Sequence, residues 1–241
     1  MITLANTPAS PEDAFLREVD EEFRRSELLK FWQRYGRIGI AVLVLALAAL
    51  AGWLYWQDRQ EKAAGAAGLA LTKAITQLEV GEGARARPVL EAMTRDGPGA
   101  YAGLARMVLA NDTLAGGDKA KARGLYEAIA NDSQLPQTLR DAALVKAVRV
   151  GFDQMAPGEV AARLKPLAVP GNPWFGVAGE LVAVAQIRAG KPDLAKPMLI
   201  AMVKDEGLAP SLRSRAAQLA IAAGVDVAAL GLAKPAAPAA Q

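Results

Sequence analysis

The hydrophobic and polar positions divide the chain into a continuous apolar run and a longer periodic part. Between Arg37 and Asp58 the sequence runs for 20 residues without a charged side chain. At about 1.5 Å per residue, the apolar residues 38–56 would form a helix of roughly 28 Å, close to the roughly 30 Å hydrocarbon core of a bilayer. The run has no polar face, which argues against the alternative of a helix buried in a soluble core. We predict a transmembrane helix over residues 38–57.

The charges on either side of this run predict its orientation. Basic residues within 15 positions of the run are more frequent before it than after it: Arg24, Arg25, Lys30, Arg34 and Arg37 precede it, and Arg59 and Lys62 follow it. Because basic flanks stay in the cytoplasm, residues 1–37 are predicted to be cytoplasmic and the remainder periplasmic, on the far side of the inner (cell) membrane.

A cleaved signal peptide is the alternative to a membrane anchor. The small residues 63–66 would suit a signal peptidase. However, 37 residues rich in acidic side chains precede the run, and the run is longer than the usual signal core of about 7–15 residues. We therefore predict a single-pass anchor that stays attached.

The periodic part predicts helices throughout. Alanine dominates, apolar residues recur every three or four positions, and β-branched residues are sparse. Glycine, proline and asparagine interrupt this pattern at 96–99, 116–118, 131–133, 157–158, 170–173, 190–193 and 207–210. The membrane helix is expected to continue outward through residues 58–70. Residues 231–241 are rich in alanine and proline, with little to bury, and are expected to be disordered.

An internal repeat relates two blocks of the periodic part. Shifting the sequence by 73 residues gives 13 identities over residues 103–151, of which seven are not alanine pairs. The non-alanine pairs are Gly103/Gly176, Gly117/Gly190, Asp132/Asp205, Leu135/Leu208, Leu139/Leu212, Arg140/Arg213 and Gly151/Gly224. A shift of 36 also gives matches, so the unit is a helix pair of about 34–39 residues, the length of tetratricopeptide-type repeats.

The repeat register has two irregularities. Gly117, Ala122 and Tyr126 follow the expected spacing of turn glycine, small residue and aromatic residue, but the third unit, near 137–168, is out of phase. The second irregularity is a set of helix breakers at one equivalent position, which suggests a kink or a late helix start: Pro88, Gly124 and Pro197.

We predict an all-α fold, with one transmembrane helix followed by a tetratricopeptide-like α-solenoid of about four helix pairs and a cap helix at 210–223. The predicted domains are a cytoplasmic amphipathic arm (1–37), the span (38–57), a periplasmic repeat domain (58–230) and the tail (231–241).

Composition argues against catalysis. The chain has a net charge of +3 and contains neither histidine nor cysteine, so Ser-His and Cys-His nucleophile pairs and histidine-bearing metal motifs are absent. Basic residues do not interleave with aromatic residues in a stripe, which gives no indication of nucleic-acid binding. We predict no enzyme, cofactor, metal or small-molecule substrate, and protein partners together with the lipid bilayer. An enzyme built on a helical fold stays open as an alternative.

The layout resembles a known family. The stretch before the span contains Phe31, Trp32, Tyr35 and Gly36, and one span and alanine-rich helical repeats follow it. This arrangement resembles the YfgM-type ancillary subunits of the SecYEG translocon in Gram-negative bacteria. The resemblance implies a non-enzymatic inner-membrane protein that contacts the translocon, periplasmic chaperones and exported chains. The alternative is a tethered scaffold for another envelope process, such as cell division or cell-wall assembly.

Two groups of residues are candidates for partner contacts. In the arm, Phe31, Trp32 and Tyr35 would form a docking handle for a membrane partner; the alternative is a helix that lies on the membrane surface or docks loosely. In the repeats, the register places further candidates on exposed inner helices: Met107, Asn111, Glu180 and Arg188. The structural alternative is that Met107 belongs to the core and that the charges form a solvated face.

Overall fold

The described part of the protein is wholly helical. The computed structural model describes the backbone of residues 11–228 and the side chains of residues 34–228. Its elements are α1 (Pro11–Glu79), α2 (Gly83–Asp96), α3 (Ala100–Ala115), α4 (Lys119–Ala130), α5 (Gln137–Gly151), η1 (Phe152–Gln154), α6 (Pro157–Leu164), α7 (Phe175–Arg188), α8 (Pro192–Lys204) and α9 (Pro210–Ala222). The predicted fold class is confirmed, and the predicted tail at 231–241 lies outside the described residues.

The chain divides into two compact units between Lys62 and Ala63. Among the described residues, the first unit contributes to the one helical segment that is long and apolar enough to cross a membrane, Arg34–Glu79. None of the apolar window of this segment is buried against protein. Leu45, Leu47 and Trp53 are more than half exposed, and a helix of this kind is stable where lipid covers it. The boundaries proposed for the arm, span, repeat domain and tail stay predictions.

The second unit begins with the last part of α1. Ala67, Leu71 and Ala74 of α1 are buried against Ala86 and Leu90 of α2. The helix that contains the apolar segment therefore also supplies the first helix of the first repeat, as the expected continuation through residues 58–70 requires.

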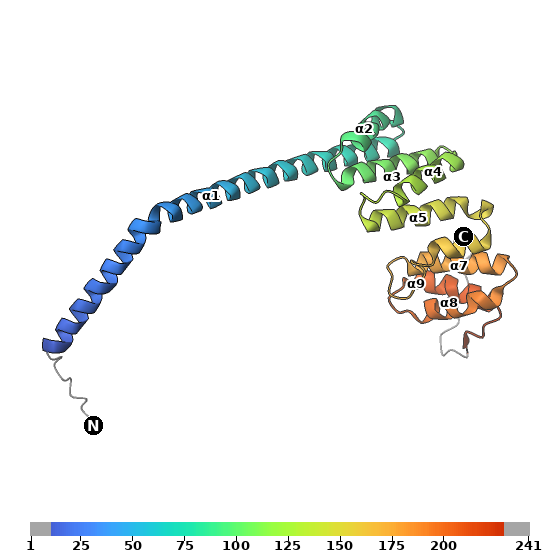
Figure 1. Cartoon of the computed structure of the whole chain (residues 1–241). Helices are drawn as coiled ribbons and strands as arrows, with labels where there is room; N and C mark the ends of the chain where they lie inside the picture. The colour runs from blue at the N-terminus through green and yellow to red at the C-terminus, as the bar shows by residue number, and fades with distance from the viewer. Residues whose placement is uncertain (1–10, 229–241) are drawn as a thin grey trace, which may run out of the picture. The chain divides into compact units, whose positions relative to one another are not determined.

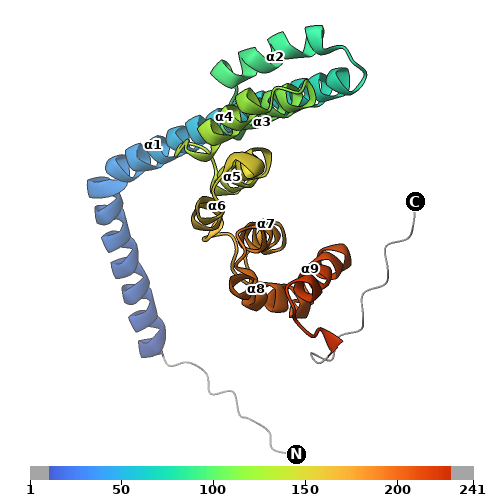
Figure 2. The same ribbon diagram turned by 90° about the vertical axis from the view of Figure 1, so that its right-hand side faces the viewer.

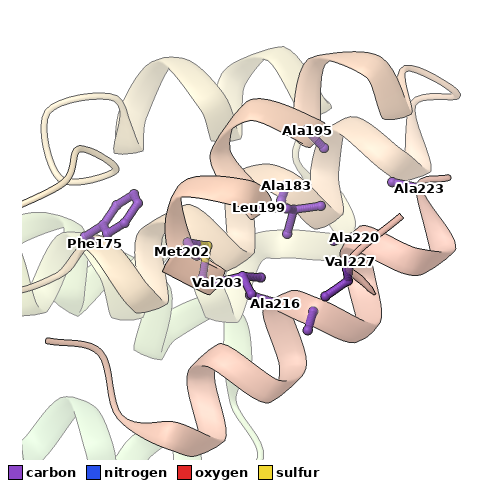
Figure 3. Packing of buried hydrophobic residues seen from close by; sticks show 11 residues of the cluster. Phe175, Ala183, Ala195, Leu199, Met202, Val203, Ala216, Ala220, Ala223 and Val227 are labelled. Carbon is purple, nitrogen blue, oxygen red and sulfur yellow. The ribbon is translucent and has the colours of Figure 1, made fainter. Parts of the chain in front are cut away.

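The remaining helices form further pairs, α3/α4, α5/α6 and α7/α8, and α9 follows them (Figures 1 and 2). Helices in adjacent pairs share core clusters, because an amphipathic helix pair buries its apolar faces only against its neighbours. Figure 3 shows the last cluster, where Leu199 and Met202 of α8 lie near Ala216 and Ala220 of α9. Helix α9 is thus the predicted cap.

The 73-residue repeat corresponds to one packing arrangement that occurs twice. A Cβ atom added to Gly103 of α3 would lie 2.6 Å from Leu139 and 2.7 Å from Leu135. A Cβ atom added to Gly176 of α7 would likewise lie 2.8 Å from Leu212 and 3.1 Å from Leu208. In both blocks the glycine is needed because two leucines fill the space of a side chain, one from α5 or α9 and one from the loop before that helix.

The turns between paired helices also repeat. Gly117 after α3 and Gly190 after α7 have φ values of +89° and +69°, which a residue with a Cβ rarely adopts. The N–H of Gly117 donates to Leu114 O at 3.0 Å, and that of Asp118 donates to Thr113 O at 3.2 Å. These bonds satisfy the last carbonyl groups of α3 and end the helix at the glycine.

The structure resolves the two irregularities of the repeat. Pro88, Gly124 and Pro197 are each the sixth residue of their helix and are exposed, so the expectation of a late helix start at this position is wrong. The third unit is out of phase because α6 has 8 residues, against 14 in α2, and an irregular segment, 165–174, connects it to α7.

Candidate protein-binding surface

The surface predicted for partner contacts lies mainly on the first helices of the pairs, and its first candidate is not exposed. Met107 of α3 is 8% exposed and packs in a core cluster with Ala110, Tyr126 and Ile129. The expectation that Met107 faces a partner is therefore corrected: its thioether fills the interface between α3, α4 and α5, as the alternative interpretation held.

Asn111 is exposed on α3, and its side chain is already engaged. The Tyr126 hydroxyl donates a hydrogen bond of 2.6 Å to Asn111 Oδ1. The Lys146 ammonium lies 5.7 Å from the centroid of the Tyr126 ring. Burial raises the pKa of the Tyr126 phenol, so the hydroxyl stays protonated and able to donate. The amide of Asn111 therefore helps join α3 to α4, and only its remaining polar atoms are available to a partner.

The two charged candidates of α7 both form ion pairs between elements. Glu180 accepts two hydrogen bonds of 2.8 Å from Arg215 of α9, and its side chain is 23% exposed. Arg188 lies 2.8 Å from Asp153, and its guanidinium lies 5.0 Å from the Phe152 ring centroid. Each pair connects helices of neighbouring repeats, which gives these residues a structural role whatever else they contact.

Sequence reasoning missed further ion pairs of the same kind. Asp132 accepts hydrogen bonds from the Gln134 backbone N–H at 3.0 Å and from Arg106 at 2.7 Å, which together hold the pKa of Asp132 below its usual value. Arg87 and Asp112 form another pair at 2.7 Å. The signal that identifies some of these pairs is opposite charge at a separation near one repeat, 35 residues for Glu180 and Arg215 and 36 for Glu127 and Arg163. The pairs Arg87–Asp112 and Arg106–Asp132 have shorter separations of 25 and 26 residues, which the repeat does not predict.

Glu127 is the centre of a charge network that links the second helices of two neighbouring pairs. Its Oε1 accepts a hydrogen bond of 2.9 Å from Arg163 of α6 and one of 3.1 Å from Arg123 of α4. Burial favours the neutral acid, but the two guanidinium groups outweigh burial and lower the pKa of Glu127. This network joins the second and third helix pairs.

Of the three aromatic residues of the predicted docking handle, the structure describes the side chain of Tyr35 alone. The side chains of Phe31 and Trp32 are not among the described ones, and both positions lie within the backbone of α1. Tyr35 is 48% exposed, with the Arg34 guanidinium 6.0 Å from its ring centroid. An exposed aromatic ring beside basic residues suits either a membrane interface or a protein contact.

Comparison with known proteins finds a repeat family and a distant relative. A family model described as a tetratricopeptide repeat-like domain matches residues 29–172. The ancillary SecYEG translocon subunit of Escherichia coli (strain K12) is 26% identical over 179 residues, which cover 73% of this chain and 84% of that protein. No solved structure matches. The resemblance noted from the sequence is thus confirmed as a distant similarity over most of the chain.

Proposed function

We propose, from the premise that this chain belongs to the tetratricopeptide repeat-like domain family, that it is a membrane-anchored scaffold for proteins, an ancillary subunit of the SecYEG translocon. The observation that carries the proposal is one chain in which an unburied apolar helix continues into four packed helix pairs. Stacked helix pairs present extended surfaces for binding proteins. The distant similarity to a protein named as a translocon subunit supports the choice of partner.

In this proposal the arm is cytoplasmic and the repeats are periplasmic. The support is the excess of basic residues before the apolar run, since basic flanks resist transfer across the membrane. The repeats would then meet exported chains and periplasmic chaperones, and the arm would meet the cytoplasmic face of the translocon. No catalytic step is part of the proposal.

Site-specific photo-crosslinking in living cells tests the partners. One probe is placed at Trp32 in the arm and one at Leu104, whose side chain is exposed on α3. A third probe, at Leu43 in the apolar run, is the lipid-facing reference. We expect translocon subunits at Trp32, and chaperones or exported chains at Leu104. Capture of division or cell-wall proteins, with no translocon component at any probe, would reject the translocon assignment in favour of another envelope scaffold.

Substitution of the arm aromatics separates docking from anchoring. Phe31→Ala combined with Trp32→Ala should abolish co-purification with the translocon while the protein stays in the membrane. The matched control is Trp53→Ala, which removes an exposed aromatic residue at the other end of the apolar run. A complex that survives the double substitution, and that depends only on residues 70–224, would contradict the role of the arm.

A further inference from the structure

The last part of α1 has one face that no other described element covers. Leu71 packs in a core cluster with residues of α2, whereas Leu69 and Val80 on the other side of the helix are 75% and 67% exposed. Exposed residues recur on this side every three or four positions and form one stripe along the helix. We call this stripe the open α1 face; it consists of Leu69, Thr72, Thr76 and Val80.

The repeat explains why this face is uncovered. In the 36-residue register, Leu69 is equivalent to Ala105 of α3, which is 0% exposed and lies in one cluster with Leu90 of α2. The first helix of each later pair thus packs on the second helix of the pair before it, but in the described part of the chain no pair precedes α1. The first end of the stack therefore leaves an apolar surface open.

The two threonines of the open α1 face do not make it costly to cover. The Thr72 hydroxyl donates a hydrogen bond of 3.0 Å to Gly68 O, and the Thr76 hydroxyl donates one of 3.2 Å to Thr72 O. Both hydroxyl donors are therefore satisfied within the helix itself. A partner can cover this face without burying a hydroxyl donor that lacks an acceptor.

The charges that flank the open α1 face have opposite sign. Lys73 and Glu79 are the only charged residues between Lys62 and Glu82, and both are exposed. Neither forms an ion pair within the described part of the chain. At about 100° of rotation per residue, Lys73 lies on one flank of the face and Glu79 on the other. The face thus has one basic and one acidic flank.

These flanks select both the identity and the direction of a partner helix. When two identical helices pack in parallel about a two-fold axis, the basic flank of each lies against the acidic flank of the other. In an antiparallel pair, lysine would instead face lysine, and glutamate would face glutamate. Lys73 and Glu79 are separated by about 9 Å along the helix axis, which the two long side chains can together span. The face therefore complements a parallel copy of itself.

We propose that the open α1 face binds the same face of a second copy of this chain, so that the protein is a parallel dimer in the membrane. The anchor imposes the direction that the charges favour: α1 is continuous with the apolar run, so two copies inserted in the same orientation bring their α1 helices together in parallel. The partner's helix then covers Leu69, as a preceding second helix covers the equivalent residue of α3. The inference rests on the membrane anchor of the proposed function and not on the translocon as partner.

Disulfide crosslinking of the full-length protein in isolated membranes tests the dimer, because the chain has no cysteine of its own. Leu69→Cys and Thr76→Cys each place one thiol on the open α1 face, and we expect oxidation to give a covalent product of two copies. Leu194→Cys is the matched control, since Leu194 is 59% exposed on α8, outside this face. It should give little product.

Charge reversal tests the parallel arrangement. In the Leu69→Cys background, Lys73→Glu or Glu79→Lys should lower the yield of the covalent product about threefold to tenfold, because each places like charges against each other on both flanks. The double variant, Lys73→Glu with Glu79→Lys, should restore the yield. A variant that merely lost its fold would not be rescued in this way.

Several results would overturn the inference. These are no product from either cysteine on the open α1 face, equal product from Leu194→Cys, and no restoration in the double charge variant. A product whose second chain is another membrane protein, identified by mass spectrometry, would also reject the dimer. Carbonate extraction reports the anchor and co-purification reports the translocon, so failure of the dimer is distinguishable from failure of the proposed function.

Discussion

The smallest feature with a large structural role is the missing side chain at Gly103. We expect Gly103→Ala to lower the free energy of unfolding by about 1–3 kcal/mol, because a methyl group would overlap Leu135 and Leu139. Gly124→Ala is the matched control, since Gly124 is exposed within α4 and a Cβ there meets nothing within 4 Å. That control should gain about 0.5–1 kcal/mol from helix propensity. Urea unfolding followed by circular dichroism measures the free energy of unfolding of both variants. If both substitutions changed it in the same direction, the close approach of the leucines to Gly103 would be contradicted.

Glu127 gives a prediction about pH. Its pKa is lowered in the folded state, so its contribution to stability is present above its unfolded pKa of about 4.3 and is lost as pH falls through the folded pKa. Glu127→Gln should therefore be less stable than the wild type at pH 7 by about 1–2 kcal/mol, and this difference should shrink below about pH 4.

The control for that experiment is Glu159→Gln. Glu159 also faces Arg163, but at 3.6 Å and with a side chain that is 48% exposed. We expect its effect to stay below about 0.5 kcal/mol. Unfolding curves measured from pH 3 to pH 7 test both variants, and a Glu127→Gln effect that does not depend on pH would contradict the network.

For single residues, the sequence predicts which positions are equivalent in the repeat better than it predicts which side chains are exposed. Met107 and Glu180 are separated by 73 residues, and the repeat correctly places them at one equivalent position. Their environments differ because the other helices differ: Arg215 pairs with Glu180 in the second block, whereas the equivalent residue of the first block is Ala142, which packs on the apolar cluster that contains Met107. Exposure depends on a partner in another helix, which the periodicity of one helix does not contain.

Among the elements, α2 carries an exposed proline in its interior, and the helix continues through it. Pro88→Ala should stabilise the protein by about 1–3 kcal/mol, because alanine restores the backbone hydrogen bond that proline cannot donate. Pro210→Ala is the control: Pro210 occupies the first turn of α9, where proline is well tolerated, so little change or a small loss is expected. Chemical denaturation tests the pair, and no gain in Pro88→Ala would mean that the helix is already adapted to the proline.

The sequence predicted most elements because its turn residues mark their ends. The clusters at 116–118 and 190–193 fall directly after α3 and α7. The short α6 was not predicted, although Pro166 offered a signal, since helices usually end at or before the residue preceding a proline.

For the whole molecule, the main prediction is that the apolar run holds the protein in the membrane. Leu43→Arg combined with Leu47→Arg should move the protein into the fraction extracted by carbonate, since each arginine near mid-bilayer costs about 2.5–3.5 kcal/mol on insertion scales. The control is Leu69→Arg combined with Thr72→Arg, two exposed positions in the repeat part of α1. Retention of the first variant in the membrane would contradict the anchor.

The architecture was predictable because a period of 3.6 residues and a repeat of 73 are both properties of the chain itself. Orientation and partners are different: they depend on how Arg34 and Arg37 meet a bilayer and on surfaces outside this chain. The family match ends at residue 172, whereas the packed helices continue through α9. Packing thus shows the extent of the repeats better than similarity of sequence does.

The paired glycine and leucine contacts have a consequence for how such a protein changes length. The block from α3 to α5 and the block from α7 to α9 use the same contact, in which Gly103 and Gly176 each meet one leucine from the loop before α5 or α9 and one from that helix. A duplicated block would carry both halves of that contact with it, the recess and the side chains that fill it. Gain or loss of a whole block would therefore preserve the contacts between glycine and leucine. Gain or loss of a single helix would instead leave a glycine without its leucines, or leucines without their glycine.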